Sequence, residues 1–85
     1  MTAAESAAAP ADPAVLDCLG KACPVPVIEL AKAVNTMTAG EEIVVLSDDP
    51  GAKVDIPVWC RMKRHELVSA VESDGLFRFT VRRVG

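Results

Sequence analysis

The stretch "VLDCLGKACPVPVIELAKAV", residues 15–34, decides the class of the fold. Its first part, residues 15–20, is a short apolar run that ends at a glycine, and this pattern predicts a strand. From residue 25 to residue 38, apolar side chains recur at positions 27, 30, 31, 34 and 37, which is the spacing of one helix face. A strand that leads directly into a helix predicts an α/β arrangement.

A second strand and a second helix follow this unit. Residues 42–47 are an apolar run rich in β-branched residues, which predicts a strand buried on both faces or nearly so. The next segment is rich in turn formers, and a helix through all of it would have to pass Pro57, which lacks an N–H group. We therefore expect a turn near 48–53 and a helix from Asp55, as its N-cap, to about Lys63.

The chain ends in a predicted β-hairpin. Its arms are residues 66–73 and 76–84, because Asp74-Gly75 favours a two-residue turn and apolar and polar side chains alternate along the second arm. The expected order is β-α-β-α-β-β, with parallel strand pairs from the two crossovers and an antiparallel pair from the hairpin. The predicted fold is a two-layer α/β sandwich, in which two helices pack on one face of a mixed four-stranded sheet.

The composition restricts the class of protein. The chain has 85 residues, so we expect one domain over residues 15–85, after a disordered Ala/Pro-rich tail over residues 1–14. This tail has no basic residue and does not resemble a signal peptide, and no apolar stretch approaches the roughly 20 residues that span a membrane. Three cysteines are too few for a disulfide-rich secreted protein. We expect a monomer in the cytoplasm, without a membrane partner.

The net charge of −3 argues against nucleic acid as a direct partner. Without Glu5 and Asp12, 10 acidic residues stand against 9 basic ones, so the domain lacks the basic excess of a nucleic-acid-binding protein. The basic residues do cluster late in the chain, which indicates either a solvated face or a docking surface for an acidic partner. They are Arg61, Lys63, Arg64, Arg78, Arg82 and Arg83.

The expected reactive residue is Cys23, which is followed by two prolines at alternate positions. If the first helix starts here, Cys23 is its N-cap, Pro24 the first helical residue and Pro26 the third. The N–H group of Val25 and the positive end of the helix dipole would then face the sulfur, lower its pKa and favour the thiolate. Lys21 would support the thiolate with a positive charge. The same environment would favour a persulfide, which is also an anion.

Pieces spread along residues 15–83 resemble the TusA/SirA family of sulfur-carrier proteins. The central motif is Cys23-Pro24-x-Pro26. The other pieces that carry the resemblance are Leu16-Asp17, Gly20, Gly40, Asp49-Pro50, Asp55-Ile56-Pro57, Cys60 and His65-Glu66-Leu67.

The resemblance implies the same β-α-β-α-β-β fold and a function without a cofactor. It implies that Cys23 accepts a persulfide sulfur from a cysteine desulfurase or a rhodanese and passes it to an acceptor protein. Such carriers serve tRNA thiolation, cofactor synthesis or sulfur oxidation. One position departs from the family, because Lys21 stands where a leucine is usual. The change alters the rim of the expected site and therefore bears on the choice of partner rather than on the chemistry.

Three other functions are compatible with the sequence: a zinc site, a redox pair of cysteines and a non-catalytic binding module. Cys18, Cys23, Cys60 and His65 supply four zinc-type ligands, although at a looser spacing than is usual in zinc sites. Cys18 and Cys23 would form a redox pair with a spacer of four residues instead of two. A non-catalytic module that binds RNA or protein would not need Cys23, but the chain has no tyrosine and only two phenylalanines to stack on bases.

The other cysteine, tryptophan, histidine and aspartate residues are expected to have structural roles. Cys18, Cys60 and Trp59 are expected in the core, Trp59 with an exposed edge. His65 is expected at the end of the second helix, where it suits the free carbonyl groups. Turn and cap roles are expected for Asp17, Asp49 and Asp55.

Overall fold

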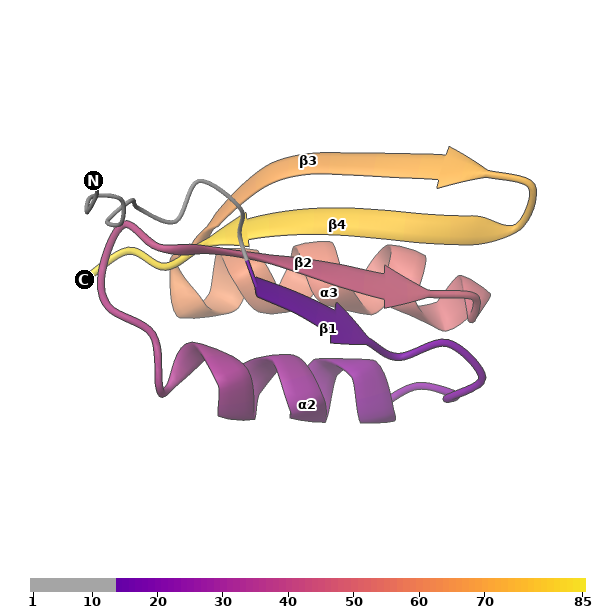
Figure 1. Ribbon diagram of the computed structural model, residues 1–85, viewed down its shortest axis with the longest axis horizontal. Helices are drawn as coiled ribbons and strands as arrows, with labels where there is room; N and C mark the ends of the chain where they lie inside the picture. The colour runs from indigo at the N-terminus through magenta and orange to yellow at the C-terminus, as the bar shows by residue number, and fades with distance from the viewer. Residues whose placement is uncertain (1–13) are drawn as a thin grey trace, which may run out of the picture.

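The computed structural model describes residues 14–85, which form four strands and two helices (Figure 1). In chain order the elements are β1 (Ala14–Asp17), α2 (Val25–Val34), β2 (Glu42–Ser47), α3 (Pro50–Lys63), β3 (Glu66–Ser73) and β4 (Leu76–Arg82). The predicted order β-α-β-α-β-β is therefore confirmed. The predicted tail over residues 1–14 lies outside the described residues except for Ala14, which already belongs to β1.

The four strands form one mixed sheet in the order β1-β2-β4-β3. β1 pairs with β2 in parallel, and β4 pairs antiparallel with both β2 and β3. The prediction that the second crossover also makes a neighbouring parallel pair is wrong, because β4 lies between β2 and β3. Three side chains of β4 (Phe77, Phe79 and Val81) are buried, whereas most residues of β3 are exposed, so the more apolar arm of the hairpin takes the central place.

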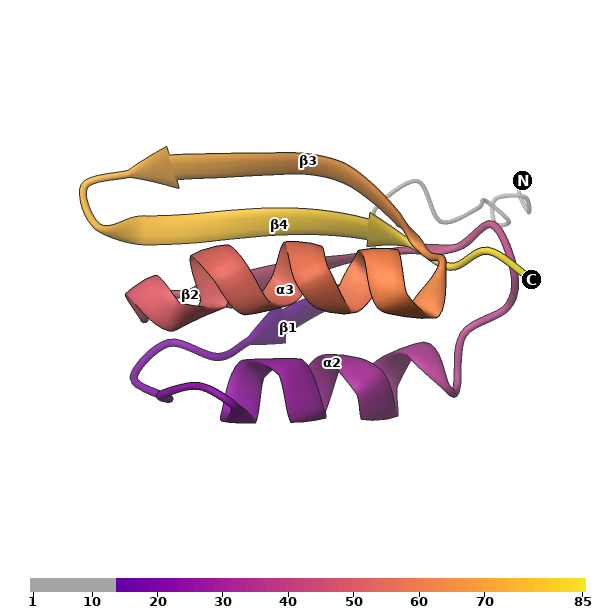
Figure 2. The ribbon, with the colours of Figure 1, turned by 180° about the vertical axis from the view of Figure 1, so that it is seen from behind.

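Both helices pack on the same face of the sheet, as the view from behind shows (Figure 2). This confirms the predicted two-layer sandwich. The core between the layers consists of Cys18, Leu30, Val34, Ile43, Val45, Ala52, Ile56, Trp59, Cys60, Phe77, Phe79 and Val81. Each large apolar side chain buried here stabilises the fold by about 1.5–3 kcal/mol. Within residues 14–85, no helix is both long and apolar enough to cross a membrane.

The second helix begins earlier than predicted, at Pro50, and Pro57 lies inside it. Pro50 is the first helical residue, where a missing N–H group costs nothing, and Asp49 takes the N-cap position that was predicted for Asp55. A proline in a helix interior costs about 3 kcal/mol. Burial of Ile56 and Trp59 against the sheet offsets this cost, so the helix continues through Pro57.

The first helix ends at Val34, earlier than the apolar periodicity to residue 38 suggests. The guanidinium group of Arg83 donates hydrogen bonds to the carbonyl oxygens of Val34 and Met37. Arg82 forms ion pairs with Glu42 and Glu66 on the neighbouring strands. Two of the late basic residues therefore hold the fold together and are not free for an acidic partner.

Candidate functional site

Cys23 lies in the loop between β1 and α2, at the end of the molecule where β1 and β2 end and both helices begin (Figure 1). Two carboxylates from the start of α3 hold this loop. Asp48 accepts a hydrogen bond from the N–H group of Gly20 at 3.0 Å, and Asp49 accepts one from the N–H group of Cys23 at 2.8 Å. The loop of the first crossover is therefore fixed by the second crossover.

The start of α2 differs from the prediction by one residue. The N-cap is Pro24, so Pro26 is the second helical residue and Cys23 lies before the cap. The peptide bond between Cys23 and Pro24 is cis. The N–H group of Val25 donates to the carbonyl oxygen of Ala22 at 3.0 Å. The amide that was predicted to face the sulfur of Cys23 is therefore already paired with a backbone oxygen.

The sulfur of Cys23 packs against the start of α3. A Cβ atom added to Gly51 would lie 3.2 Å from Cys23 Cβ, 3.4 Å from Cys23 Sγ and 2.9 Å from Asp49 Oδ2. Only a glycine lets the helix approach the cysteine this closely without displacing a neighbour. Sequence analysis missed Gly51, although a glycine directly after a helix-starting Asp-Pro pair is the kind of residue that marks a close approach.

The electrostatic environment of Cys23 is opposite to the prediction. Its pKa is raised from 9.0 to about 12, first because burial disfavours the thiolate, and then because Asp49 and Asp55 accept hydrogen bonds from the thiol and add negative charge. Cys23 is partly buried rather than fully exposed. The charge of Lys21 lowers the pKa of Cys18 and is not among the influences on Cys23. The resting sulfur is therefore a protonated thiol.

Asp49 and Asp55 reach Cys23 from one side of α3. Asp49 is the N-cap, yet its side chain makes no capping hydrogen bond to its own helix and turns to Cys23 instead. The N–H group of Cys23 is the main reason that the pKa of Asp49 is lowered. Asp55 lies four residues after Gly51, and residues at this spacing share one helix face. The predicted cap role of Asp55 is wrong, and its place is beside the thiol.

The other two cysteines are core residues, as predicted. Cys18 is 0% exposed and Cys60 is 2% exposed. Burial raises the pKa of both thiols, that of Cys60 to about 11. Trp59 is also buried, with 7% of its surface exposed. All three cysteines of the described chain are free thiols, and Cys23 is the only one that is not buried.

The four residues of the alternative zinc site do not come together. Among residues 14–85, no group of three or more His, Cys, Asp or Glu side chains is placed to hold a metal ion. Cys23 contacts the start of α3, whereas His65 follows its last turn, and a helix of 14 residues is about 20 Å long. His65 is occupied there, because its Nδ1 atom accepts a hydrogen bond from the N–H group of Val84 at 3.1 Å.

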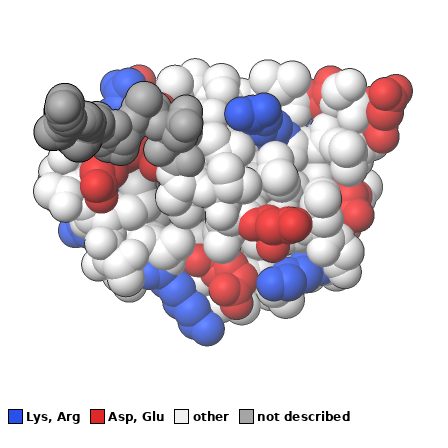
Figure 3. Space-filling model, in the orientation of Figure 1, with Lys and Arg blue, Asp and Glu red and all other residues white. Residues whose placement is uncertain are grey.

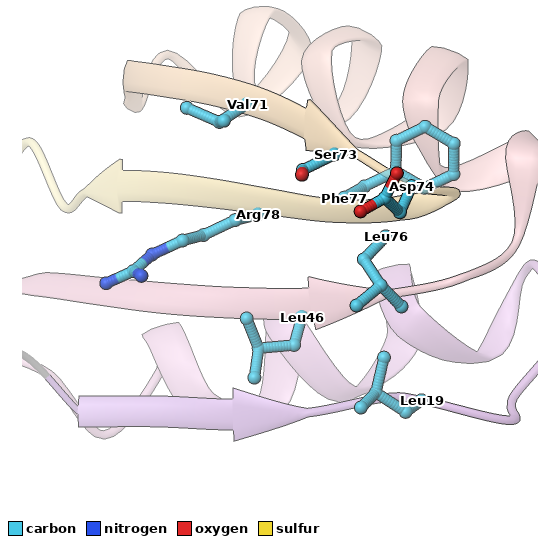
Figure 4. A pocket seen from close by; sticks show the side chains of 8 residues that line it. All are labelled: Leu19, Leu46, Val71, Ser73, Asp74, Leu76, Phe77 and Arg78. Carbon is cyan, nitrogen blue, oxygen red and sulfur yellow. The ribbon is translucent and has the colours of Figure 1, made fainter.

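The open face of the sheet carries no continuous charged patch (Figure 3). A shallow pocket lies on this face, and Figure 4 shows Leu19 and Leu76 pointing toward one another across it. No cysteine is among its lining residues, which are Leu19, Leu46, Val71, Ser73, Asp74, Leu76, Phe77 and Arg78. The pocket therefore does not include Cys23, although Leu19 comes from the same β1–α2 loop.

The two helices carry exposed apolar residues, which together are called the apolar strip. Val54, Val58 and Met62 recur every four residues on α3, and between 46% and 67% of each is exposed. On α2, Val25 and Ile28 are 37% and 47% exposed. Exposed apolar residues that recur on one face of a helix are typical of a surface that meets another protein.

Comparison with known proteins agrees with this geometry. Residues 14–83 match the family described as sulfurtransferase TusA. The fold is similar to the crystal structure of a SirA-like protein from Desulfitobacterium hafniense, with a TM-score of 0.73 and 26% sequence identity. The similarity covers 84% of this chain and 97% of the other. Since the family match spans almost all of the described residues and includes the Cys-Pro-x-Pro loop, the chain belongs to the TusA family of sulfurtransferases.

Proposed function

We propose that this protein carries sulfur as a persulfide on Cys23. The observation that supports this most directly is that Cys23 is the only cysteine outside the core of the described chain, in a loop that hydrogen bonds fix to α3. Cys18 and Cys60 are too deeply buried to meet another protein's cysteine. A carrier of persulfide sulfur needs one accessible thiol, and the described part of the chain offers one.

The proposed donor is a cysteine desulfurase or a rhodanese that holds a persulfide on its own cysteine. The Cys23 thiol, written Cys23–SH, gives up its proton and attacks the outer sulfur of the donor persulfide, written donor–S–SH. The sulfur–sulfur bond of the donor breaks, the outer sulfur bonds to Cys23, and the Cys23 proton passes to the donor cysteine. The products are Cys23–S–SH and donor–SH, so atoms and charge balance and no external oxidant or reductant takes part.

The proposed docking surface is the apolar strip formed by Val25, Ile28, Val54, Val58 and Met62. It begins at Val25, two residues after Cys23, and continues along the two helices, so a partner that covered it would bring its own cysteine to the loop. Pro24 and Pro26 would hold the loop rigid, Val25 would contribute to the strip, and Lys21 would lie at its rim. The partners are proteins, and we propose no cofactor and no direct contact with nucleic acid.

The proposed acceptor is a further protein of tRNA thiolation, cofactor synthesis or sulfur oxidation. We propose that the protein works as a monomer in the cytoplasm, where reducing conditions keep Cys23 free between transfers.

The test is to mix the protein with a cysteine desulfurase and cysteine, and to record the intact mass without reductant. We expect a species one sulfur atom heavier, which disappears when dithiothreitol is added. Cys23→Ser should abolish it, whereas Cys18→Ala and Cys60→Ala should retain it as matched controls. Sulfur loading that persists in Cys23→Ser would overturn the proposal.

A further inference from the structure

The two carboxylates beside Cys23 bear on the direction in which sulfur moves. Asp49 accepts the hydrogen bond from Cys23 N–H at 2.8 Å although it is the N-cap of another helix. Gly51 brings α3 within contact of the sulfur, and Asp55 lies on the same helix face one turn later. Both carboxylates raise the pKa of the thiol, each as a hydrogen-bond acceptor within its reach and as a negative charge. Two carboxylates therefore converge on one sulfur atom, which can donate a single hydrogen bond.

We propose that Asp49 and Asp55 are positioning residues that keep the outer sulfur on Cys23 as a neutral –S–SH group, ready for attack by an acceptor thiolate. This inference rests on the proposed function of Cys23. A carboxylate can accept a hydrogen bond from –SH but repels –S⁻, so the arrangement that favours the protonated thiol also favours the protonated persulfide. A persulfide is a stronger acid than a thiol, and without such neighbours it would be largely anionic at neutral pH.

No other charged group acts on the Cys23 sulfur in the described chain. The charged residues at the end of β1, in the β1–α2 and β2–α3 loops and in the first two turns of each helix are Asp17, Lys21, Glu29, Asp48, Asp49, Lys53 and Asp55. Asp48 accepts the hydrogen bond of Gly20, and Lys53 pairs with Glu72 at 3.1 Å. Lys21, Glu29 and Asp17 influence Cys18. Asp49 and Asp55 are therefore the charged groups that raise the pKa of Cys23, in addition to burial, which raises it most.

Protonation decides which atom is attacked and which group leaves. An acceptor thiolate, written acceptor–S⁻, attacks the outer sulfur of Cys23–S–SH, because a neutral persulfide is an electrophile and an anionic one is not. The bond between the two sulfurs breaks, and its electron pair stays on Cys23 Sγ. The resulting Cys23 thiolate, beside two carboxylates, takes the proton of the transferred persulfide.

The products are therefore acceptor–S–S⁻ and Cys23–SH. Atoms and charge balance, and the sulfur moves without a net oxidation. Proton uptake by Cys23 favours delivery, because the same two carboxylates that repel its thiolate accept a hydrogen bond from its thiol. The reverse step, loading of an empty carrier, must first remove that proton. The carboxylates therefore favour release of sulfur over its uptake.

The experiment compares Asp49→Asn, Asp55→Asn and the double variant with the wild type. Asparagine keeps the size and the acceptor oxygen, and it is also a good N-cap, so the fold should be preserved. The first measurement is the rate at which iodoacetamide alkylates Cys23 between pH 7 and pH 10, followed by peptide mass. The second loads the protein with sodium polysulfide and follows release of the sulfur to glutathione over the same pH range.

We expect the two rates to change in opposite directions. At pH 8, alkylation should rise about tenfold for each unit by which the pKa of Cys23 falls, because the thiolate fraction rises by that factor. Release to glutathione should fall, by up to about tenfold per unit, and its pH optimum should move to lower pH. A variant that merely loosened the loop would not slow one reaction while accelerating the other.

Asp74→Asn is the matched control, because it removes the same charge at the β3–β4 turn, and Asp74 is not among the groups that shift the pKa of Cys23. Both of its rates should equal those of the wild type. If the alkylation and release rates of the three test variants stay unchanged, or rise or fall together, the inference is overturned while Cys23 remains the carrier. If neither a cysteine desulfurase nor a rhodanese loads sulfur on wild-type Cys23, the proposed function itself fails.

Discussion

The carboxylate of Asp49 accepts a hydrogen bond from the N–H group of Cys23 at 2.8 Å, across 26 residues of sequence. Asp49 lies directly before the first residue of α3, and Cys23 lies directly before Pro24, the N-cap of α2. The bond therefore joins the two crossovers of the sheet at one point. Anything that displaces the start of α3 is expected to displace Cys23 as well, and four consequences of the structure can be measured directly.

Gly51→Ala should destabilise the protein although alanine is the better helix former. The new Cβ atom would lie 2.9 Å from Asp49 Oδ2 and 3.2 Å from Cys23 Cβ, so the start of α3 must move. Overpacking of this kind costs about 1–3 kcal/mol, more than the 0.5–1 kcal/mol that alanine gains over glycine in a helix. Urea unfolding measures the difference. A more stable Gly51→Ala variant would contradict the close contact.

The stability conferred by Cys60 should disappear at high pH. Burial raises its pKa to about 11, above the ordinary value of 9.0. Its contribution is therefore complete below pH 9 and is lost as the pH rises toward 11, because only the unfolded chain releases the proton in that range. The free energy of unfolding should approach that of Cys60→Ala by about 1.4 kcal/mol per pH unit. A constant difference between the two proteins from pH 8 to pH 11 would refute the burial of this thiol.

Arg83→Ala should loosen the end of α2. The Arg83 guanidinium donates to the carbonyl oxygens of Val34 and Met37, and its loss leaves these groups without that partner. We expect a loss of about 1–3 kcal/mol in the free energy of unfolding and faster amide hydrogen exchange in the last turn of α2. Arg78→Ala is the control, because Arg78 is exposed on β4, and it should stay within about 0.5 kcal/mol of the wild type. Equal effects of the two substitutions would mean that Arg83 does not cap the helix.

Phe79→Ala should come close to unfolding the protein. Phe79 is 2% exposed in the centre of the core, and a buried phenylalanine truncated to alanine costs about 3–5 kcal/mol. Val71→Ala, on the exposed edge strand β3, should change stability by less than about 0.5 kcal/mol. Circular dichroism during thermal unfolding distinguishes the two. A Phe79→Ala variant as stable as Val71→Ala would be inconsistent with the packed core.

The parts of the fold that local sequence patterns determine were predictable. The strand over residues 42–47 and the hairpin around Asp74-Gly75 follow from runs of neighbouring residues, and the structure confirms both. The place of β4 between β2 and β3 was not predictable in this way. It depends on which strand buries more apolar surface against two helices, and that is a property of the assembled layers.

The surroundings of Cys23 were mispredicted for a similar reason. The Cys-Pro-x-Pro motif indicated the reactive residue, and its neighbours in sequence suggested a lowered pKa. The groups that act on the sulfur, Asp49, Gly51 and Asp55, come from more than 25 residues away. At the sequence level they appeared only as turn and cap residues, and Pro57 concealed the fact that one helix carries all of them at its start.

The central position of β4 has a consequence for how the protein is made. β4 is the last strand of the chain and the partner of both β2 and β3, so before it is available β3 has no neighbouring strand in the sheet. While β4 is still inside the ribosome, the chain therefore cannot close its sheet. Until β4 emerges, the inner edge of β2 and all of β3 are open to pairing with other chains. Completion of the native sheet thus waits for the emergence of β4.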